Sequence, residues 1–250
     1  MPRDSAAHRL SPLAHIGEGV TLGNGVSVGP GAVVLGPAVI EDGVWIGPGA
    51  QIGAPPEMSN LRQNTAWTGD LEHGGVRIKE GAVIRENAVI HQGSYRETTI
   101  GERCWVLARA YIAHDALISA DTTVSAGVSV GGHCVIGPRV NIGMNAAIHQ
   151  RVTIGAGAMI GMSTPLTRDV PPYAKVFGSP ARLRSINTVG MQRFGIDEAS
   201  VALLQDRYNS GDVLLDEPLP LDPTSALAVD IKWWVSQPSR SPINVCRQEH

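Results

Sequence analysis

Residues 100–136 read IGERCWVLARAYIAHDALISADTTVSAGVSVGGHCVI, and an aliphatic residue returns at every sixth position. These positions are Ile100, Val106, Ile112, Ile118, Val124, Val130 and Ile136. An α-helix cannot keep a period of six on one face over this length, whereas three strand-and-turn units can close a triangular coil of about 18 residues. The period therefore predicts an all-β, left-handed parallel β-helix of hexapeptide repeats, with aliphatic side chains stacked inside it roughly 4.8 Å apart.

The repeat extends well beyond this segment. It continues to Leu166, and earlier runs cover Ile16 to Ile52 and Ile78 to Ile90. Two segments, 55–77 and 94–99, interrupt the period, so we expect them to be loops that leave the coil at a corner. A sandwich of short strands would instead show variable spacing and alternation by two.

A different structure is expected after Leu166. Pro171 and Pro172 lack the N–H donors of a ladder, so we expect them to stop the sheet. Residues 197–209 carry an N-cap aspartate and helical apolar spacing, which predict a helix. A second helix is expected from about Pro223 to Trp234, with a loose tail after Pro238. The predicted parts are a lead-in (1–15), the β-helix (16–168) and a small, partly helical C-terminal region (169–250).

Composition excludes several classes of protein. The net charge of −3 and the pI near 6.2 show no excess of positive charge that would attract nucleic acid or an anionic membrane. Cys104, Cys134 and Cys246 form no CxxC pair, which fits a reducing compartment better than a disulfide framework or a zinc knuckle. Neither a leader-like N-terminus nor a run of eighteen apolar residues occurs. We therefore expect a cytoplasmic protein that does not insert into membranes.

Four histidines of the repeats are expected on one edge of the prism. Counting in eighteens places His114, His133 and His149 on the same corner, over two coils or about 10 Å. His91 joins them when the four extra residues between Ile90 and Ile100 are treated as a bulge. Imidazoles gathered on an edge suit either proton transfer near neutral pH or metal binding.

Proton transfer is the better supported of these two roles. Asp115 follows His114 and can fix its tautomer, and Gly132 lies on the same corner one coil along, where its N–H can approach an oxyanion. His114 and His149 are too far apart to share a metal within one chain. We therefore expect no metal site in a single chain, while a site between subunits stays open.

Several motifs combine these residues. They are Ala110-Tyr111-Ile112-Ala113-His114-Asp115, Gly132-His133, Ile148-His149-Gln150, Ile90-His91-Gln92-Gly93 and Asp169-Val170-Pro171-Pro172-Tyr173. Over most of its length the sequence resembles the UDP-N-acetylglucosamine acyltransferases of lipid A biosynthesis, which are hexapeptide-repeat acyltransferases.

This resemblance implies a homotrimer with its sites in clefts between neighbouring coils. His114 would be the general base, assisted by Asp115, with Gly132 as oxyanion donor. The acceptor and acyl pocket would be lined by His91, His133, His149 and Gln150. The co-substrates would be a nucleotide sugar and an acyl group on acyl carrier protein or coenzyme A, with no bound cofactor and no covalent intermediate.

The resemblance also covers three positions near the C-terminal region. Met162 matches the residue that limits acyl length, which predicts a medium or short acyl chain. Asn187 and Arg193 match positions associated with the nucleotide and the carrier. The sequence departs from the family at residues 56–60, where a glutamine, aspartate and lysine cluster is usual, and at Tyr111, where histidine is usual.

These departures leave other functions open. The enzyme could acylate a different amino sugar or a small amine, on nitrogen or oxygen, from either donor. A carbonic anhydrase-like metalloenzyme shares this fold, but its usual pair of histidines five apart on one chain is missing here. A passive β-helical spacer is the remaining alternative.

Overall fold

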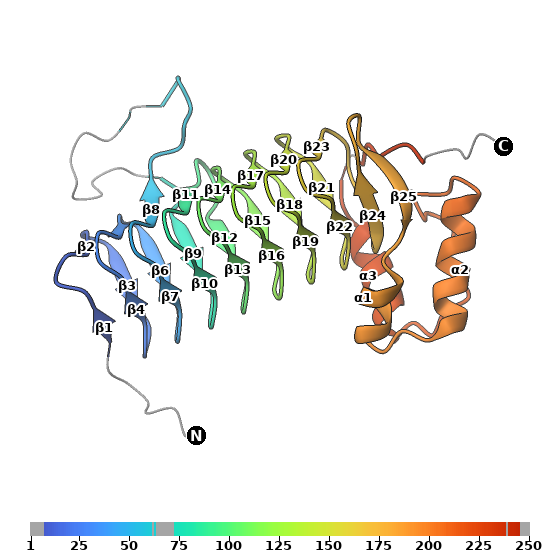
Figure 1. The fold of residues 1–250 in the computed structure, drawn as a ribbon, viewed down its shortest axis with the longest axis horizontal. Helices are drawn as coiled ribbons and strands as arrows, with labels where there is room; N and C mark the ends of the chain where they lie inside the picture. Colours follow the sequence, from blue (N-terminus) through green and yellow to red (C-terminus); the bar gives the residue numbers. More distant parts are fainter. Residues whose placement is uncertain (1–7, 62, 64–72, 239, 246–250) are drawn as a thin grey trace.

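The computed structural model describes residues 8–61, 63, 73–238 and 240–245. Figure 1 shows short strands stacked along a straight coil, with the helices gathered at its C-terminal end. The strands form three parallel faces, which we name sheets A, B and C, and successive strands visit the faces in turn. The structure is therefore the parallel β-helix that the six-residue period predicts.

Sheet A has ten strands. Its last strand pairs antiparallel with the strand before it, and the other described neighbours in this sheet are parallel. The ten strands are β1 (Arg9–Leu10), β4 (Ser27–Val28), β7 (Trp45–Ile46), β10 (Val83–Ile84), β13 (Trp105–Val106), β16 (Thr123–Val124), β19 (Asn141–Ile142), β22 (Met159–Ile160), β24 (Ala174–Phe177) and β25 (Arg182–Ile186).

Sheets B and C complete the prism. Sheet B contains β2 (His15–Ile16), β5 (Val33–Val34), β8 (Gln51–Ala54), β11 (Val89–His91), β14 (Tyr111–Ile112), β17 (Ser129–Val130), β20 (Ala147–Ile148) and β23 (Pro165–Leu166). Sheet C contains β3 (Val20–Leu22), β6 (Ala38–Ile40), β9 (Val76–Ile78), β12 (Thr98–Ile100), β15 (Leu117–Ile118), β18 (Val135–Ile136) and β21 (Thr153–Ile154).

The repeat positions form the core. Ile112 pairs in register with Ile90 below it and Val130 above it, and all three are fully buried. Small residues four positions after a repeat residue, such as Ala146 and Ala158, are buried as well. Aliphatic stacking therefore fills the interior, as expected for a chain with two phenylalanines.

The corners share one backbone conformation. In the turn after a sheet-B strand, the third residue has a positive φ, as at Asp115 (60°), His133 (63°) and Arg151 (66°). The second residue has no partner for its N–H in the ladder, and proline accordingly occupies the equivalent position after strands of the other two sheets, at Pro30 after β4 and Pro138 after β18. This free amide recurs at the functional corner described below.

The two loops are shorter than predicted. The first ends before β9, which begins at Val76, and the second ends at Glu97, because Thr98 and Thr99 belong to β12. Part of the first loop, with Trp67, lies outside the described residues. Residues 94–97 fold back over the neighbouring corner, where they contact Asp115.

The expectation that Pro171 and Pro172 stop the sheet is wrong. Val170 still bridges Ile154, and β24 adds a further strand that places Val176 beside Ile160. Pro172 occupies the second turn position, whose N–H has no ladder partner, and Pro171 follows Val170, the last paired residue of sheet C, so neither proline removes a ladder bond. The hairpin β24–β25 then ends sheet A.

Three helices follow: α1 (Thr188–Arg193), α2 (Glu198–Asn209) and α3 (Ala226–Val235). Asp197 caps α2 as predicted, because its side chain accepts a hydrogen bond from Ser200 N at 2.9 Å. The predicted second helix begins at Ala226 instead of Pro223, since Ser225 is its N-cap. The short helix α1 was not predicted.

The C-terminal region is fastened to the coil. Arg139, on a coil corner, forms an ion pair with the buried Asp230 of α3, whose carboxylate also accepts a hydrogen bond from Tyr173 at 2.6 Å. The expected loose tail is not loose over its described part, because Pro242 bridges Asp169 and Val245 bridges Leu183. Within the described residues, none of the helices is long and apolar enough to cross a membrane.

Candidate active site

All four predicted histidines lie at the ends of sheet-B strands or in the turns directly after them. His91 ends β11, and His114, His133 and His149 lie in the turns after β14, β17 and β20. These strands are paired in register, so the four residues share the corner between sheets B and C. We call this corner the histidine edge. Counting in eighteens thus places His114, His133 and His149 correctly, and the assumed bulge does the same for His91.

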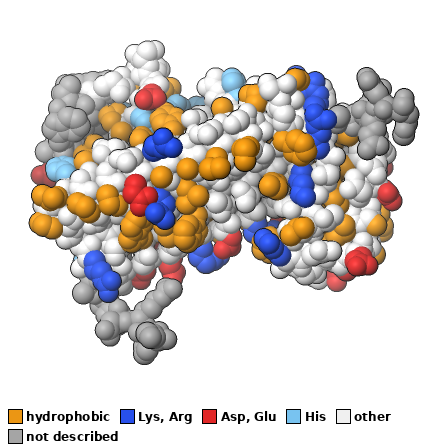
Figure 2. All heavy atoms as spheres, in the orientation of Figure 1, with side chains coloured by type: hydrophobic (Ala, Val, Ile, Leu, Met, Phe, Trp, Pro, Cys, Tyr) orange, Lys and Arg blue, Asp and Glu red, His pale blue; other side chains and the backbone are white. Residues whose placement is uncertain are grey.

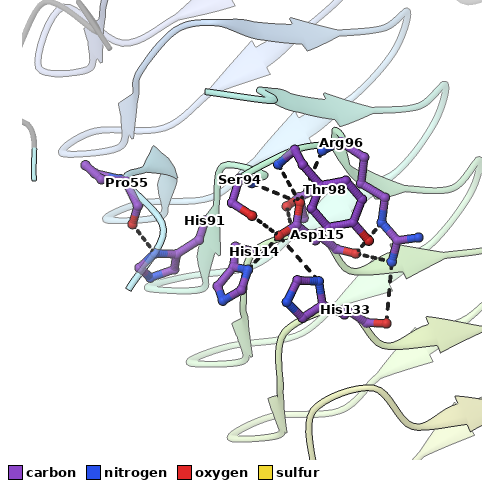
Figure 3. Close-up of polar contacts among 9 residues, drawn as sticks. Pro55, His91, Ser94, Arg96, Thr98, His114, Asp115 and His133 are labelled. Atoms are coloured by element: carbon purple, nitrogen blue, oxygen red, sulfur yellow. Dashed lines mark hydrogen bonds and ion pairs between the residues drawn. The ribbon is translucent and has the colours of Figure 1, made fainter. Parts of the chain in front are cut away.

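Asp115 organises the centre of this edge (Figure 3). Its Oδ2 lies 2.7 Å from Nδ1 of His114 and 3.5 Å from Nδ1 of His133. The two imidazole rings meet edge to face, with centroids 4.8 Å apart. Both histidine side chains are about one-tenth exposed, whereas Asp115 is fully buried. The carboxylate therefore holds His114 in place while the rings remain reachable from outside.

A buried carboxylate needs hydrogen-bond donors, and the loop 94–97 supplies them. Oδ1 of Asp115 accepts hydrogen bonds from the backbone N–H groups of Ser94 (2.9 Å), Tyr95 (3.2 Å) and Arg96 (3.3 Å). Oδ2 accepts a further bond from the Ser94 hydroxyl at 2.6 Å. The ejected loop is thus a support for the active corner, a role that sequence reasoning missed.

The loop and the first residue of β12 also fix the backbone around Asp115. Arg96 Nε donates to the Asp115 carbonyl at 2.9 Å, and the Asp115 N–H donates to Thr98 Oγ1 at 2.8 Å. Tyr95 stacks on His133, with ring centroids 5.7 Å apart. Asp115 adopts its positive φ within this frame, and aspartate tolerates that conformation better than most residues do.

The hydrogen bonds also set the charge of Asp115. Burial alone would raise the pKa of this carboxyl, but bonds from Ser94, His114 and the backbone of Tyr95 and Arg96 outweigh burial and lower the pKa to about 2. Asp115 is therefore ionised at neutral pH. An ionised carboxylate only accepts hydrogen bonds, so Nδ1 of His114 donates to it, and Nε2 is the nitrogen of that ring that Asp115 leaves unengaged.

A pH dependence of stability follows from this lowered pKa. The ordinary value is 3.8, so ionised Asp115 stabilises the folded chain by about 2 kcal/mol above pH 4, and this contribution is lost as the pH falls through 2. The measurement is the free energy of unfolding in urea at pH 7, 4 and 3, for wild type and for Asp115→Asn, whose side-chain amide does not titrate. We expect the stability gap between the two proteins to narrow below pH 4. A gap that does not change with pH contradicts this assignment.

Gly132 lies against the free side of His114. A Cβ built on Gly132 would lie 2.8 Å from Cε1 and 2.9 Å from Nε2 of that ring. Within the described residues, the Gly132 N–H donates no hydrogen bond, because Gly132 occupies the amide-free turn position. The side of Gly132 that lacks a Cβ therefore faces Nε2 of His114, the ring nitrogen that Asp115 does not engage.

We expect Gly132→Ala to lower kcat about a hundredfold without unfolding the protein. Alanine already occupies the same turn position at Ala108 and Ala126, so the backbone accepts it. The added methyl group would push the His114 ring out of line. Steady-state kinetics with a thermal melt checks this expectation. Near-normal kcat in a folded Gly132→Ala protein contradicts the close approach.

A second polar group lines the N-terminal side of the edge. His91 Nδ1 lies 2.6 Å from the Pro55 carbonyl, and Tyr111 donates a hydrogen bond to Glu57 at 2.7 Å. Glu57 also lies 4.0 Å from Nε2 of His91. Burial lowers the pKa of His91, only partly opposed by Pro55 and Glu57, and burial likewise lowers the pKa of His133. Both rings are therefore neutral at pH 7.

The remaining predicted residues lie outside the centre of the histidine edge. His149 and Gln150 continue the edge and are exposed. Met162 lies on a different corner, after β22 of sheet A, and its side chain is 68% exposed. Asn187 caps α1 and donates a hydrogen bond to the Gly157 carbonyl, and Arg193 is exposed at the end of that helix. One chain therefore does not bring Met162 to the histidine edge.

The edge also contains a set of potential metal ligands. Ligand atoms of His114, Asp115 and His133 lie within 4.8 Å of one another. Oδ2 of Asp115, however, already bonds the Ser94 hydroxyl and His114 Nδ1, and its other oxygen takes three backbone N–H groups. This donor set fits a hydrogen-bonded acid–base pair better than a cation.

Comparisons with known proteins give the relatives of this chain. Residues 169–216 match the protein family described as "Udp N-acetylglucosamine O-acyltransferase; Domain 2". The chain is 32% identical over 206 residues to the acyl-[acyl-carrier-protein]–UDP-N-acetylglucosamine O-acyltransferase of Stutzerimonas stutzeri (strain A1501), and this alignment covers 80% of each chain. A protein of the same name from Pseudomonas putida (strain GB-1) is 33% identical over 148 residues, 56% of this chain and 57% of that one.

Solved structures share the fold. The UDP-N-acetylglucosamine acyltransferase from Campylobacter jejuni superposes with a TM-score of 0.76 at 24% identity, covering 96% of this chain and all of that one (100%). The enzyme of that name from Bacteroides fragilis gives 0.71 at 24% identity, covering 96% and 98%. At these identities, the likeness concerns the fold alone.

Proposed function

Because this chain belongs to the acyl-[acyl-carrier-protein]–UDP-N-acetylglucosamine O-acyltransferase family, we propose that it transfers an acyl group from acyl carrier protein to a hydroxyl of a UDP-N-acetylglucosamine-like nucleotide sugar. In that family the reaction belongs to lipid A biosynthesis. The observation that carries the proposal is the contact of His114 Nδ1 with the buried Asp115, which leaves Nε2 free beside Gly132.

The reaction begins with proton transfer to His114. Nε2 takes the proton of the acceptor hydroxyl as its oxygen attacks the thioester carbonyl, and the ionised Asp115 stabilises the imidazolium that forms. The negative charge moves onto the former carbonyl oxygen, where the Gly132 N–H donates a hydrogen bond to it. When the C–S bond breaks, His114 returns the proton to the leaving thiolate. The acyl group passes directly to the sugar, so no covalent enzyme intermediate is needed.

Neighbouring groups position the acceptor. The neutral rings of His91 and His133 each offer a hydrogen bond without adding charge. Glu57 is two-thirds exposed, and Tyr111 donates a hydrogen bond to it. Its carboxylate has further lone pairs that can accept hydrogen bonds from hydroxyl groups of the sugar. Asn187 and Arg193, at the two ends of α1, contact the nucleotide and the carrier in this proposal.

We propose that the working enzyme is a homotrimer. His149 and Gln150 are exposed on the edge, and Met162 lies on another corner, so an acyl pocket made of all three needs a second chain. Sheet A also leaves Trp105, Met159 and Phe177 exposed, and Figure 2 shows hydrophobic side chains along this face of the coil. A long Met162 side chain shortens the slot, which favours a medium or short acyl chain.

The cysteines support a cytoplasmic location. Cys104 and Cys134 are buried free thiols, and burial raises the pKa of each to about 11 and about 12. Cys246 lies outside the described residues. Unbridged cysteines are usual in a reducing compartment.

A direct assay tests this function. Purified protein is incubated with UDP-N-acetylglucosamine and medium-chain acyl carrier protein, and products are identified by mass spectrometry. We expect an ester-linked acyl sugar nucleotide and one free thiol per product. Parallel reactions replace the carrier with coenzyme A, or the acceptor with an amino-sugar nucleotide. Turnover only with one of those replacements, or no turnover in any reaction, overturns the proposed substrates.

A further inference from the structure

A groove of about 490 Å³ lies beside the last coil, near the hairpin β24–β25. Thr167 and Arg168 line it from the turn after β23, residues 179–182 line it from the hairpin turn, and residues 243–244 close it from the C-terminal segment. Three segments far apart in sequence thus build one concave surface. None of the residues assigned above to catalysis lines it.

The groove is basic. Arg168 and Arg182 line it together with the polar side chains of Thr167, Ser179 and Asn244, and no carboxylate does so. Arg182 donates to the Ala181 carbonyl and Arg168 to the Ser241 hydroxyl. Within the described part of the chain, neither guanidinium lies within ion-pair distance of an acid. Two guanidinium groups beside hydroxyl and amide side chains, in a groove that no carboxylate lines, favour a phosphate-like oxyanion.

The β-helix register relates this groove to the active site. Ile112, Val130, Ile148 and Leu166 are paired in sequence across sheet B. The residues two positions after them are His114, Gly132, Gln150 and Arg168. Arg168 therefore occupies the turn position of His114 three coils further along the same edge, at a spacing of about 14 Å.

We propose that this groove binds the phosphate of the 4′-phosphopantetheine arm that carries the acyl thioester. About thirteen bonds separate the thioester sulfur from that phosphorus, which corresponds to roughly 15 Å at the rise of an extended chain. The sulfur would then lie at His114 while the phosphate reaches Arg168 and Arg182. The first phosphate of a sugar nucleotide lies only one sugar ring from the reacting hydroxyl, which is too short for this span. The inference rests on the proposed function.

The test compares donors with and without the phosphate. Acyl-4′-phosphopantetheine and acyl-pantetheine are assayed with wild type, with the double variant Arg168→Gln/Arg182→Gln, and with Lys232→Gln, which removes an exposed cation of α3 outside the groove. We expect wild type and Lys232→Gln to prefer the phosphorylated donor at least tenfold in kcat/KM. The double variant should lose that preference through a higher donor KM, with kcat and acceptor KM within threefold of wild type.

Calorimetric titration with 4′-phosphopantetheine separates this inference from the proposed function, because it needs no turnover. Binding to wild type and Lys232→Gln that weakens at least tenfold in the double variant supports the groove, even if the assigned acceptor is wrong. An unchanged donor preference in the folded double variant overturns the inference. A change confined to the KM of the sugar nucleotide also overturns it, since the groove would then bind the acceptor's diphosphate.

Discussion

His114→Ala is expected to lower kcat by 10²–10⁴-fold while leaving the KM of donor and acceptor within a few-fold of wild type. The ring is the base in the proposed reaction, and its Nε2 is the nitrogen that no described residue engages. Without the ring, no base accepts the hydroxyl proton and no acid returns it to the leaving thiolate. The other residues that bind the substrates stay in place. Initial rates of thiol release, with both substrates varied, measure the separate effects on kcat and KM.

His149→Ala is the matched control for this prediction. His149 lies on the same edge and is also an imidazole, but it is exposed and bonds only the neighbouring Gln150 carbonyl. We expect its effect to fall mainly on KM. A His114→Ala protein that keeps more than a tenth of wild-type kcat would remove His114 from the role of base.

Asp115→Asn is expected to lower kcat by about 10³–10⁴-fold with little change in shape. The asparagine oxygen can still accept the backbone N–H groups of loop 94–97, but its NH₂ group would then face Nδ1 of His114. An NH₂ donor at that position favours the tautomer with the proton on Nε2. The nitrogen that should accept the substrate proton is then already protonated.

Ser94→Ala serves as the control for this variant. It removes one hydroxyl bond to the carboxylate while leaving Asp115 ionised and the tautomer of His114 unchanged. We expect it to cost less than tenfold in kcat. The magnitudes for the two variants come from kinetics at pH 7.5, with near-ultraviolet circular dichroism as the check on folding. Equal losses for Ser94→Ala and Asp115→Asn would mean that support of the loop, and not the tautomer, is what matters.

The coil could be predicted from sequence because its core uses one rule throughout. Each repeat residue stacks on a copy of itself, so a strict period is visible without any long-range information. The same rule predicted the common corner of His91, His114, His133 and His149. Their placement needed only the period and one assumed bulge.

The period could not predict how the coil ends. Val170 follows Ile154 by sixteen residues instead of eighteen, because the turn between Leu166 and Val170 is two residues short, and the two prolines after Val170 suggested a stop to the sheet. Pro172 occupies the amide-free turn position and Pro171 follows the last paired residue of sheet C, so neither proline prevents sheet A from continuing into β24. The helix α1 is only one to two turns long and carries a glycine, so its spacing was too weak to predict it.

The supports of the site were also beyond the sequence pattern. Ser94 and Arg96 lie outside the repeat, and nothing in their spacing pairs them with Asp115. A signal did exist: a buried aspartate on a coil corner needs donors, and the bulge lies one coil below it. The pairing of Glu57 with Tyr111 joins residues 54 apart in the chain and depends on how the first loop folds.

A crystal structure of the protein with UDP-N-acetylglucosamine bound tests the central claim most directly. We predict that one sugar hydroxyl oxygen lies within about 3 Å of Nε2 of His114, on the side of the ring that faces Gly132. A sugar bound on another corner of the coil, or one whose hydroxyls all lie well beyond hydrogen-bond distance of Nε2, would contradict the assignment of His114 as the base.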